Sequence, residues 1–376
     1  MSKHRRGNGE GTLRQRPNGT WECQVQVEGR RHSFYGPTAK AVRAKAKAAV
    51  ERIESGGPVQ DSSRSIAEWL AHWRITTLAA SDRKEATQAL YSTLSRKHLE
   101  AGPFGQIRLD KLRASDIEAL ILALRARSLS DSTVRHIYTV LRAGLDGAVR
   151  DGLLARNPAA LIARPGVKRT EARHLSADEV SRLLKAAADS RHYVAMALIA
   201  ATGLRKGEAL GLDWGHVDLE AATITVVATL GRIGGRWVIS EPKSERSRRT
   251  IPLSPAMVSL LKKHRTAQKE DRLRAANQWQ DSGLVFTTEF GGPVDPWAFL
   301  RAVQVAAAQV GLREVNVHTL RHSAAVSWLE SGTHIRAVAD ALGHSSIAIT
   351  GDIYGHATPD VLRNAVQGLS DQLGLS

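Results

Sequence analysis

Six residues in the second half of the chain have the side chains needed for chemistry on a phosphodiester. In chain order they are Arg205, Lys243, His318, Arg321, His344 and Tyr354. A phosphodiester under attack gathers negative charge on its non-bridging oxygens, which the permanently charged forks of two arginines can bind. A tyrosine hydroxyl, with an ordinary pKa of about 10, needs a nearby histidine and a cationic pocket to act as a nucleophile. A lysine beside the phosphate can protonate the departing oxygen. Together these residue types are suited to breaking and rejoining a phosphodiester.

The pattern of apolar residues predicts a helix that carries one histidine and one arginine of this set. Residues Val317–Glu330 combine apolar positions at helical spacing with Gly332 just past the end. His318 and Arg321 are three residues apart on this helix, so they share a face.

The other arginine follows the apolar run Val194–Ala201. Glu208 lies three residues after Arg205, a spacing at which its carboxylate can hold the guanidinium in one orientation. Alone, such a pair is most often a surface ion pair, so its significance depends on the other residues of the set.

Lys243 follows a β-rich part of the chain, Ala222–Leu230 with Trp237–Ile239, and precedes the apolar segment Thr250–Leu253. This arrangement predicts a lysine on a hairpin tip. From there its side chain can reach into a groove.

These pieces stand in the order found in one protein family. They are Thr-Gly-Leu-Arg205-Lys-Gly-Glu, Pro-Lys243 followed by Arg-Arg-Thr-Ile-Pro-Leu, His318-Thr-Leu-Arg321-His, Leu-Gly-His344-Ser-Ser-Ile and Tyr354-Gly-His. Residues 176–366 thereby resemble the catalytic domain of the tyrosine recombinase, or phage integrase, family. The resemblance implies a type IB transesterification: a tyrosine attacks DNA, forms a 3′-phosphotyrosine and frees a 5′-hydroxyl, and exchange proceeds through a Holliday junction. Neither ATP nor a metal is required, and no cofactor is expected.

The resemblance also implies a role for each residue. Arg205 and Arg321 stabilise the transition state, Lys243 is the general acid, His318 is a general base or phosphate ligand, His344 donates a hydrogen bond, Tyr354 is the nucleophile, and Glu208 orients Arg205. The implied partners are double-stranded DNA attachment sites, further copies of the chain in a homotetramer on DNA, and accessory proteins such as an excisionase or a DNA-bending protein. The expected source is a phage or another mobile element.

Three alternative interpretations stay open. His318 and His322 have the spacing of two zinc ligands on a helix, with His334, His344 and His356 downstream, but Thr319 stands where a zinc protease has a glutamate. A DNA-binding regulator without activity would have a similar charge and fold. A type IB topoisomerase would share the chemistry without sequence-specific synapsis.

The composition agrees with a DNA partner. The formal net charge is +16 and the sequence pI is about 10.4, as expected for a protein that neutralises phosphates. No apolar run is long enough for a membrane span, and the basic start of the chain does not have the pattern of a signal peptide. Cys23 is the single cysteine, which excludes an intrachain disulfide and suits a reducing compartment. We expect a cytoplasmic protein without a membrane partner.

The first part of the chain predicts a small sheet followed by a basic helix. Short strands are expected at Thr12–Gln15, Thr20–Val27 and Arg30–Tyr35, with a helix from Thr38 to about Glu54. Residues 1–57 resemble the arm-type DNA-binding domain of some integrases, which lays its sheet in the major groove, although a basic hairpin has other uses. The candidates for DNA contact are Arg14, Arg16, Trp21, Arg30 and Arg31.

The remaining chain divides into two further predicted domains. Residues 64–165 form an all-helical block that resembles the family's core-binding DNA clamp, with capping boxes predicted at Ser65–Glu68 and Ser115–Glu118. Residues 174–376 are the expected catalytic domain, opened by a capping box at Ser176–Glu179. The predicted fold is therefore multidomain and mainly α with small β-sheets: a three-stranded sheet plus a helix, a helical domain and an α+β catalytic domain.

Overall fold

The computed structural model describes residues 11–27, 30–54, 64–168, 173–240 and 248–344, together with the single positions 346, 347, 351, 367, 370, 371 and 373. The chain separates into two compact units, residues 1–169 and 170–376. Each unit has its own hydrophobic core, and the first contains two separate cores.

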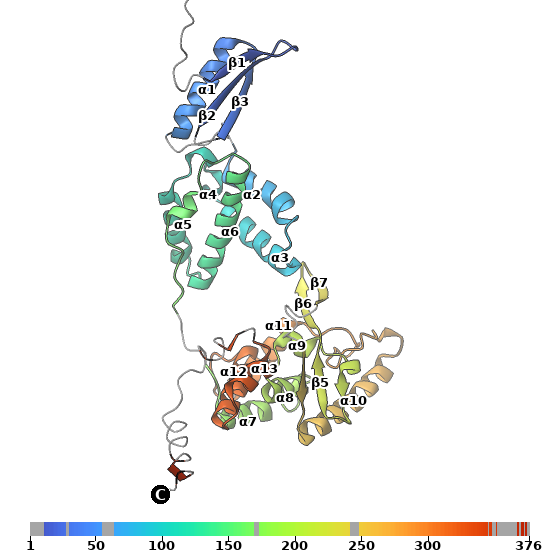
Figure 1. Cartoon of the computed structure of the whole chain (residues 1–376). Helices are drawn as coiled ribbons and strands as arrows, with labels where there is room; N and C mark the ends of the chain where they lie inside the picture. The colour runs from blue at the N-terminus through green and yellow to red at the C-terminus, as the bar shows by residue number, and fades with distance from the viewer. Residues whose placement is uncertain are drawn as a thin grey trace, which may run out of the picture. The chain divides into compact units, whose positions relative to one another are not determined.

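An antiparallel sheet opens the first unit, with one helix covering one of its faces (Figure 1). The strands are β1 (Thr12–Gln15), β2 (Trp21–Val27) and β3 (Arg30–Gly36), and the helix is α1 (Ala39–Glu54). Alternate residues of the strands pack toward the helix, where Cys23, Val25 and Phe34 contact Val42 and Ala46. The predicted strands and helix are confirmed, and the opposite face of the sheet is not covered by α1.

The rest of the first unit is helical. Its elements are α2 (Ile66–Trp73), the π-helical turn η1 (Arg74–Leu78), α3 (Glu85–Leu94), the π-helical turn η2 (Ser95–Glu100), α4 (Pro103–Gln106), α5 (Ala114–Ala126) and α6 (Asp131–Arg150), with short 3₁₀ turns at Leu109–Lys111 and Pro158–Leu161. Trp69 of α2 is buried against α6 and donates its indole N–H to the carbonyl of Gly144 at 2.8 Å. Buried aromatic and aliphatic side chains from α2 and α6 therefore form the centre of this block.

Capping explains where two of these helices begin. Ser65 and Glu68 form the predicted capping box at the start of α2. The capping box predicted at Ser115 is wrong, because α5 already begins at Ala114 and the Asp116 carboxylate accepts the N–H of Arg113 at 2.8 Å. Asp116, two residues earlier, thus takes the place that the sequence pattern assigned to Glu118.

The second unit surrounds one central helix. Its helices are α7 (Ala177–Ala186), α8 (Tyr193–Thr202), α9 (Lys206–Leu210), α10 (Pro255–Ala275), α11 (Pro296–Gln309), α12 (Val317–Glu330) and α13 (Ile335–Leu342), with 3₁₀ turns at Trp214–His216 and Ala276–Gln278. The helix α8 is apolar on nearly all sides and is buried, as such a sequence requires. The predicted helix at Val317–Glu330 and the capping box at Ser176 are confirmed.

The β-strands of the second unit form two small antiparallel sheets. One has the order β4 (Val217–Asp218), β5 (Thr223–Val226), β8 (Arg249–Pro252), and the other is the hairpin of β6 (Thr229–Ile233) and β7 (Arg236–Ser240). The segment that the sequence suggested as one β-rich stretch is therefore divided between two sheets. The hairpin turns at Gly234 and Gly235, both with positive φ, so Lys243 follows this hairpin and does not occupy its turn. Lys243 itself lies outside the described residues.

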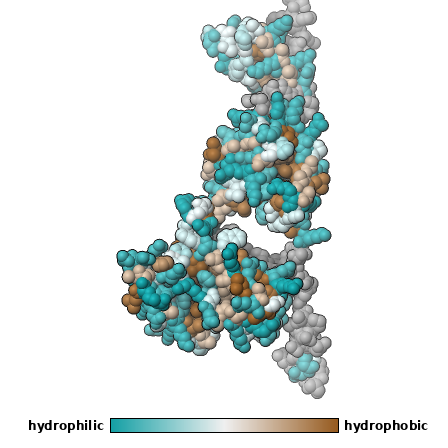
Figure 2. All heavy atoms as spheres, turned by 180° about the vertical axis from the view of Figure 1, so that it is seen from behind, coloured by the Kyte–Doolittle hydropathy of each residue, from teal (hydrophilic) through white to brown (hydrophobic). Residues whose placement is uncertain are grey.

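The predicted fold class, mainly α with small antiparallel sheets, is confirmed. Hydrophilic residues cover much of the surface seen in Figure 2, and hydrophobic residues form scattered patches between them. Within the described residues, no helix combines the length and the apolar character needed to cross a membrane.

Candidate active site

The end of the central helix positions the first arginine. The helix α8 stops at Gly203, whose φ of +64° is the left-handed conformation that glycine adopts without strain. Arg205 follows in an extended conformation and precedes α9. Its backbone N–H donates to Glu208 at 2.9 Å and its Nη1 donates to the same carboxylate at 2.7 Å. Glu208 thus holds both the backbone and the guanidinium of Arg205.

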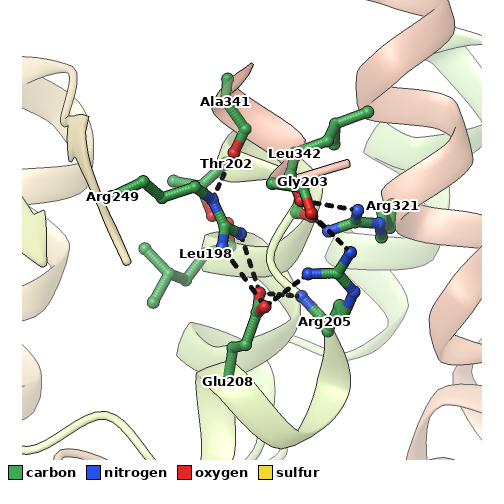
Figure 3. A network of polar contacts seen from close by, with 10 residues as sticks. Leu198, Thr202, Gly203, Arg205, Glu208, Arg249, Arg321, Ala341 and Leu342 are labelled. Atoms are coloured by element: carbon green, nitrogen blue, oxygen red, sulfur yellow. Dashed lines mark hydrogen bonds and ion pairs between the residues drawn. The ribbon is translucent and has the colours of Figure 1, made fainter. Parts of the chain in front are cut away.

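The second arginine lies on α12, which is capped by Asn316. Arg321 is only 2% exposed. Its Nη1 donates to the carbonyl of Gly203 at 2.6 Å and its Nη2 to the carbonyl of Leu342 at 2.8 Å (Figure 3). These bonds compensate for burying its charge, and they fix the guanidinium between the ends of α8 and α13.

Three histidines surround the arginines and are held in the neutral form. Burial lowers the pKa of His344 to about 4, and the charges of Arg321 and Arg205 add to this effect. Burial, followed by neighbouring positive groups, also lowers the pKa of His322 to about 4. The pKa of His318 is lowered by desolvation of its ring and then by the same two arginines. The rings of His318 and His322 meet edge to face, with centroids 4.4 Å apart.

Sequence reasoning missed Arg249, the first residue of β8. Its Nη2 and Nη1 donate to the Glu208 carboxylate at 2.8 and 3.3 Å, and its Nε donates to the carbonyl of Ala341 at 2.6 Å (Figure 3). Burial raises the pKa of Glu208, but the bonds and charges of Arg249 and Arg205 outweigh it and hold that pKa at about 2. The signal in the sequence was the spacing of two from buried Ile251, which places Arg249 on the inward face of the strand.

The structure thus brings together four of the six residues identified from the sequence. Arg205, His318, Arg321 and His344 come from the turn before α9, from α12 and from the end of α13, while Lys243 and Tyr354 lie outside the described residues. The cluster contains three guanidiniums and one carboxylate, which binds two of them, so the cluster keeps a positive charge. Arginine forks beside neutral imidazoles can bind an anion such as a phosphate and exchange a proton with it.

A sequence profile described as the phage integrase family matches residues 173–360, which include the whole cluster. The chain belongs to the phage integrase family. As a member it is a tyrosine-type site-specific recombinase.

Known proteins resemble this integrase over most of its length. A tyrosine recombinase XerC-like protein of Caldanaerobacter subterraneus subsp. tengcongensis is 28% identical over 359 residues, covering 91% of this chain and 92% of that protein. The Tn1549 transposon integrase, solved with transposon right end DNA, has a TM-score of 0.66 and 23% identity, covering 81% of this chain and 99% of that one. A lambda integrase tetramer bound to a Holliday junction has a TM-score of 0.60 and 18% identity, covering 95% of this chain and 99% of that one. The two structures share the fold.

A zinc site of the kind considered from the sequence would use His318 and His322 as ligands. Within the described part of the chain, no three His, Cys, Asp or Glu side chains are arranged to hold a metal ion. His318 and His322 contact each other through their rings, and Cys23 is buried in the sheet of the first unit. His356 lies outside the described residues.

The candidate contacts of the N-terminal sheet fall on two faces. On the uncovered face, Glu22 is buried and accepts bonds from Arg14 Nε at 2.8 Å and Arg16 Nε at 3.0 Å, which lower its pKa. Arg31 is paired with Gln26 and shares this face by the alternation of the strands. Trp21 instead packs partly against the core on the α1 side, so it does not share a face with these arginines, and its role as a DNA contact stays a prediction. The side chain of Arg30, which had also been selected, lies outside the described part of the structure.

Proposed function

We propose that the integrase cuts and rejoins DNA at attachment sites through a 3′-phosphotyrosine. The observation that carries this proposal is the cluster of Arg205 and Arg321 with His318 and His344 around the end of α13. Both guanidiniums are oriented by fixed partners, and such preorganised donors stabilise developing charge at little further cost.

Each group has one task in the proposed reaction. The hydroxyl oxygen of Tyr354 attacks the scissile phosphorus, and the bond from phosphorus to the 5′-oxygen breaks. Arg205 and Arg321 bind the non-bridging oxygens as they gain charge. His318, kept neutral by its surroundings, accepts the phenol proton or binds the phosphate, and His344 donates a hydrogen bond. Lys243 protonates the leaving 5′-oxygen.

The same chemistry then runs in reverse on a partner duplex. A free 5′-hydroxyl from the exchanged strand attacks the phosphotyrosine, releases Tyr354 and forms a Holliday junction after the first pair of exchanges. The energy of the original bond is kept in the phosphotyrosine, so the reaction uses neither ATP nor a metal. Four copies of the chain act together on two duplexes. Accessory proteins, an excisionase or a DNA-bending protein, set the direction.

Each part of the chain with its own hydrophobic core is given one role in this proposal. Residues 64–165 form a helical clamp on core DNA, and residues 174–376 carry the reaction. The sheet and helix within residues 1–57 bind separate arm sites through the face that α1 leaves uncovered. The arginines of that face support this assignment, because phosphate contacts from Arg side chains are a common basis of affinity for DNA.

A covalent adduct with a nicked suicide substrate tests the reaction. The full chain is incubated, in excess chelator, with nicked duplexes that tile the DNA flanking its coding sequence. We expect one duplex to give an adduct resistant to denaturation, because the 5′-hydroxyl fragment diffuses away and traps the phosphotyrosine. Binding without an adduct on any duplex would favour the non-catalytic regulator. An adduct that forms only after zinc or magnesium is restored would favour a metal-dependent enzyme.

Two substitutions on the sheet face test the arm assignment. Arg14→Ala combined with Arg31→Ala should weaken binding to arm-site DNA and reduce the slope of log affinity against log salt by about two, one per lost phosphate contact. Cleavage of a short core duplex should be unchanged. The matched control is Lys40→Ala combined with Lys47→Ala, which removes the same charge from α1 on the other side. Equal losses in both double variants would show that general charge, and not this face, binds the arm site.

A further inference from the structure

The last turn of α13 ends against three guanidiniums. Arg249 Nε donates to the carbonyl of Ala341 at 2.6 Å, Arg321 Nη2 to that of Leu342 at 2.8 Å, and Arg205 Nη2 to that of Gly343 at 3.0 Å (Figure 3). The last carbonyls of a helix have no partners within the helix, and they carry its partial negative charge. The three arginines therefore form a binding site for the end of this helix, with one guanidinium at each of three consecutive carbonyls.

We infer that Arg249 is a positioning residue that docks the end of α13 against Arg205 and thereby sets the geometry of the catalytic cluster. This inference rests on the proposed function for its effect on catalysis. The docking itself is a property of the protein without DNA.

The position of Arg249 distinguishes it from the two proposed catalytic arginines. Its side chain is 7% exposed and binds the buried carboxylate of Glu208 with both Nη atoms. Glu208 simultaneously holds Arg205 through its other contacts. Arg249 therefore joins three elements, β8, α9 and the end of α13, that are far apart in the sequence.

Loss of Arg249 would change the balance of charge around Glu208. The carboxylate is 3% exposed, so it cannot recover full hydration when one of its two guanidinium partners is removed. Arg205 would become its sole guanidinium partner among those described, and the carbonyl of Ala341 would lose a charged donor. We expect Arg205 to move toward Glu208 and the end of α13 to loosen.

The chain order gives this connection its importance for the reaction. Arg249 stands six residues after Lys243, and His344 follows directly on Gly343 at the end of α13. Tyr354 follows His344 by ten residues. Arg249 is therefore the described residue that links the strand after the proposed acid to the helix before the proposed nucleophile.

The docking is tested by hydrogen exchange and titration in the DNA-free full chain. The amides of Gly343 and His344 bond to the carbonyls of Asp340 and Ala339, each at 3.0 Å. In Arg249→Gln, we expect these two amides to exchange about tenfold faster or more, since the helix end opens locally more often. The pKa of His344, lowered to about 4 by burial and by the nearby arginines, should rise toward the ordinary histidine value of 6.5.

Two further variants separate docking from a general loss of structure. Arg249→Lys keeps the charge, but an ammonium group cannot bind both Glu208 and the carbonyl of Ala341 as the planar guanidinium does. We therefore expect amide exchange and the pKa of His344 to change in the same direction as in Arg249→Gln, but by less. Arg191→Ala is the matched control, because Arg191 binds the buried carboxylate of Asp271 at 2.6 Å elsewhere in the same unit. The control should lower the melting temperature without affecting the amides of α13 or the titration of His344.

Adduct formation supplies the catalytic readout. Arg249→Gln should slow adduct formation roughly 10- to 100-fold while DNA affinity is unchanged, as expected when reacting groups are misplaced by about 1 Å. Unchanged exchange and titration in Arg249→Gln and Arg249→Lys, or equal changes in the Arg191→Ala control, would overturn the inference. If the wild-type chain forms no adduct, the proposed function fails, whereas the exchange and titration data still decide whether Arg249 docks α13.

Discussion

Tyr354→Phe should bind attachment-site DNA with the affinity of the wild-type chain and form no covalent adduct. The substitution removes one hydroxyl oxygen, the atom proposed to attack phosphorus, and keeps the aromatic ring. The measurement is the yield of adduct on the nicked suicide substrate, compared with binding of the intact duplex. Complete loss is expected because no second nucleophile replaces the phenol oxygen.

The structure gives the other four tyrosines different surroundings. Tyr138 is buried and donates to the carbonyl of Ala159 at 2.7 Å, and Tyr35 donates to Glu22 at 3.2 Å. Tyr91 packs against the core of the helical block, and Tyr193 starts the buried helix α8. Tyr193→Phe is the matched control in the catalytic unit and should keep full adduct yield. An adduct retained in Tyr354→Phe, with DNA mapped to another tyrosine, would disprove the assignment.

Lys243→Ala should slow cleavage of an ordinary duplex by about two to four orders of magnitude, the usual contribution of a general acid. A substrate with sulfur in place of the 5′-bridging oxygen should be cleaved nearly normally by the same variant, because the thiolate leaves without a proton. Single-turnover rates on the two substrates give the measurement. Equal defects on both would exclude Lys243 as the acid.

Lys206 provides the comparison for this experiment. It follows Arg205 directly, its Nζ donates to the carbonyl of Pro296 at 3.3 Å, and burial lowers its pKa. A lysine with a lowered pKa beside the site is the rival candidate for the acid. If Lys206 held that role, sulfur in the substrate would rescue Lys206→Ala and not Lys243→Ala. We expect rescue of Lys243→Ala alone.

The sequence was sufficient for the parts of the site that depend on local pattern. The bounds of α12 follow from apolar spacing and from an end signal near Gly332, so His318 and Arg321 were correctly expected on one helix. The capping box at Ser176 likewise requires only neighbours in the chain. Arg205 was identified from the motif Thr-Gly-Leu-Arg205-Lys-Gly-Glu, which follows the apolar run Val194–Ala201.

Contacts between distant parts of the chain could not be predicted in this way. Arg249 bonds to Glu208, 41 residues earlier, and to Ala341, 92 residues later. Nothing local distinguishes it from Arg248, except that alternation places it on the same side as Ile251. The division of Ala222–Leu230 between two sheets has the same origin, since each half pairs with a different partner strand.

The arginines recognise the end of α13 through backbone carbonyls, and this affects how the protein can change during evolution. Side chains on the exposed face of α13, such as Arg336 and Ala337, can be replaced without removing any of the three carbonyl contacts. Gly343 is the exception, because its φ is +65° and a Cβ there would lie 2.9 Å from Arg249 Nη1. Substitutions on the exposed face of α13 can therefore be tolerated, whereas replacement of Gly343 would disturb the contacts that hold the cluster.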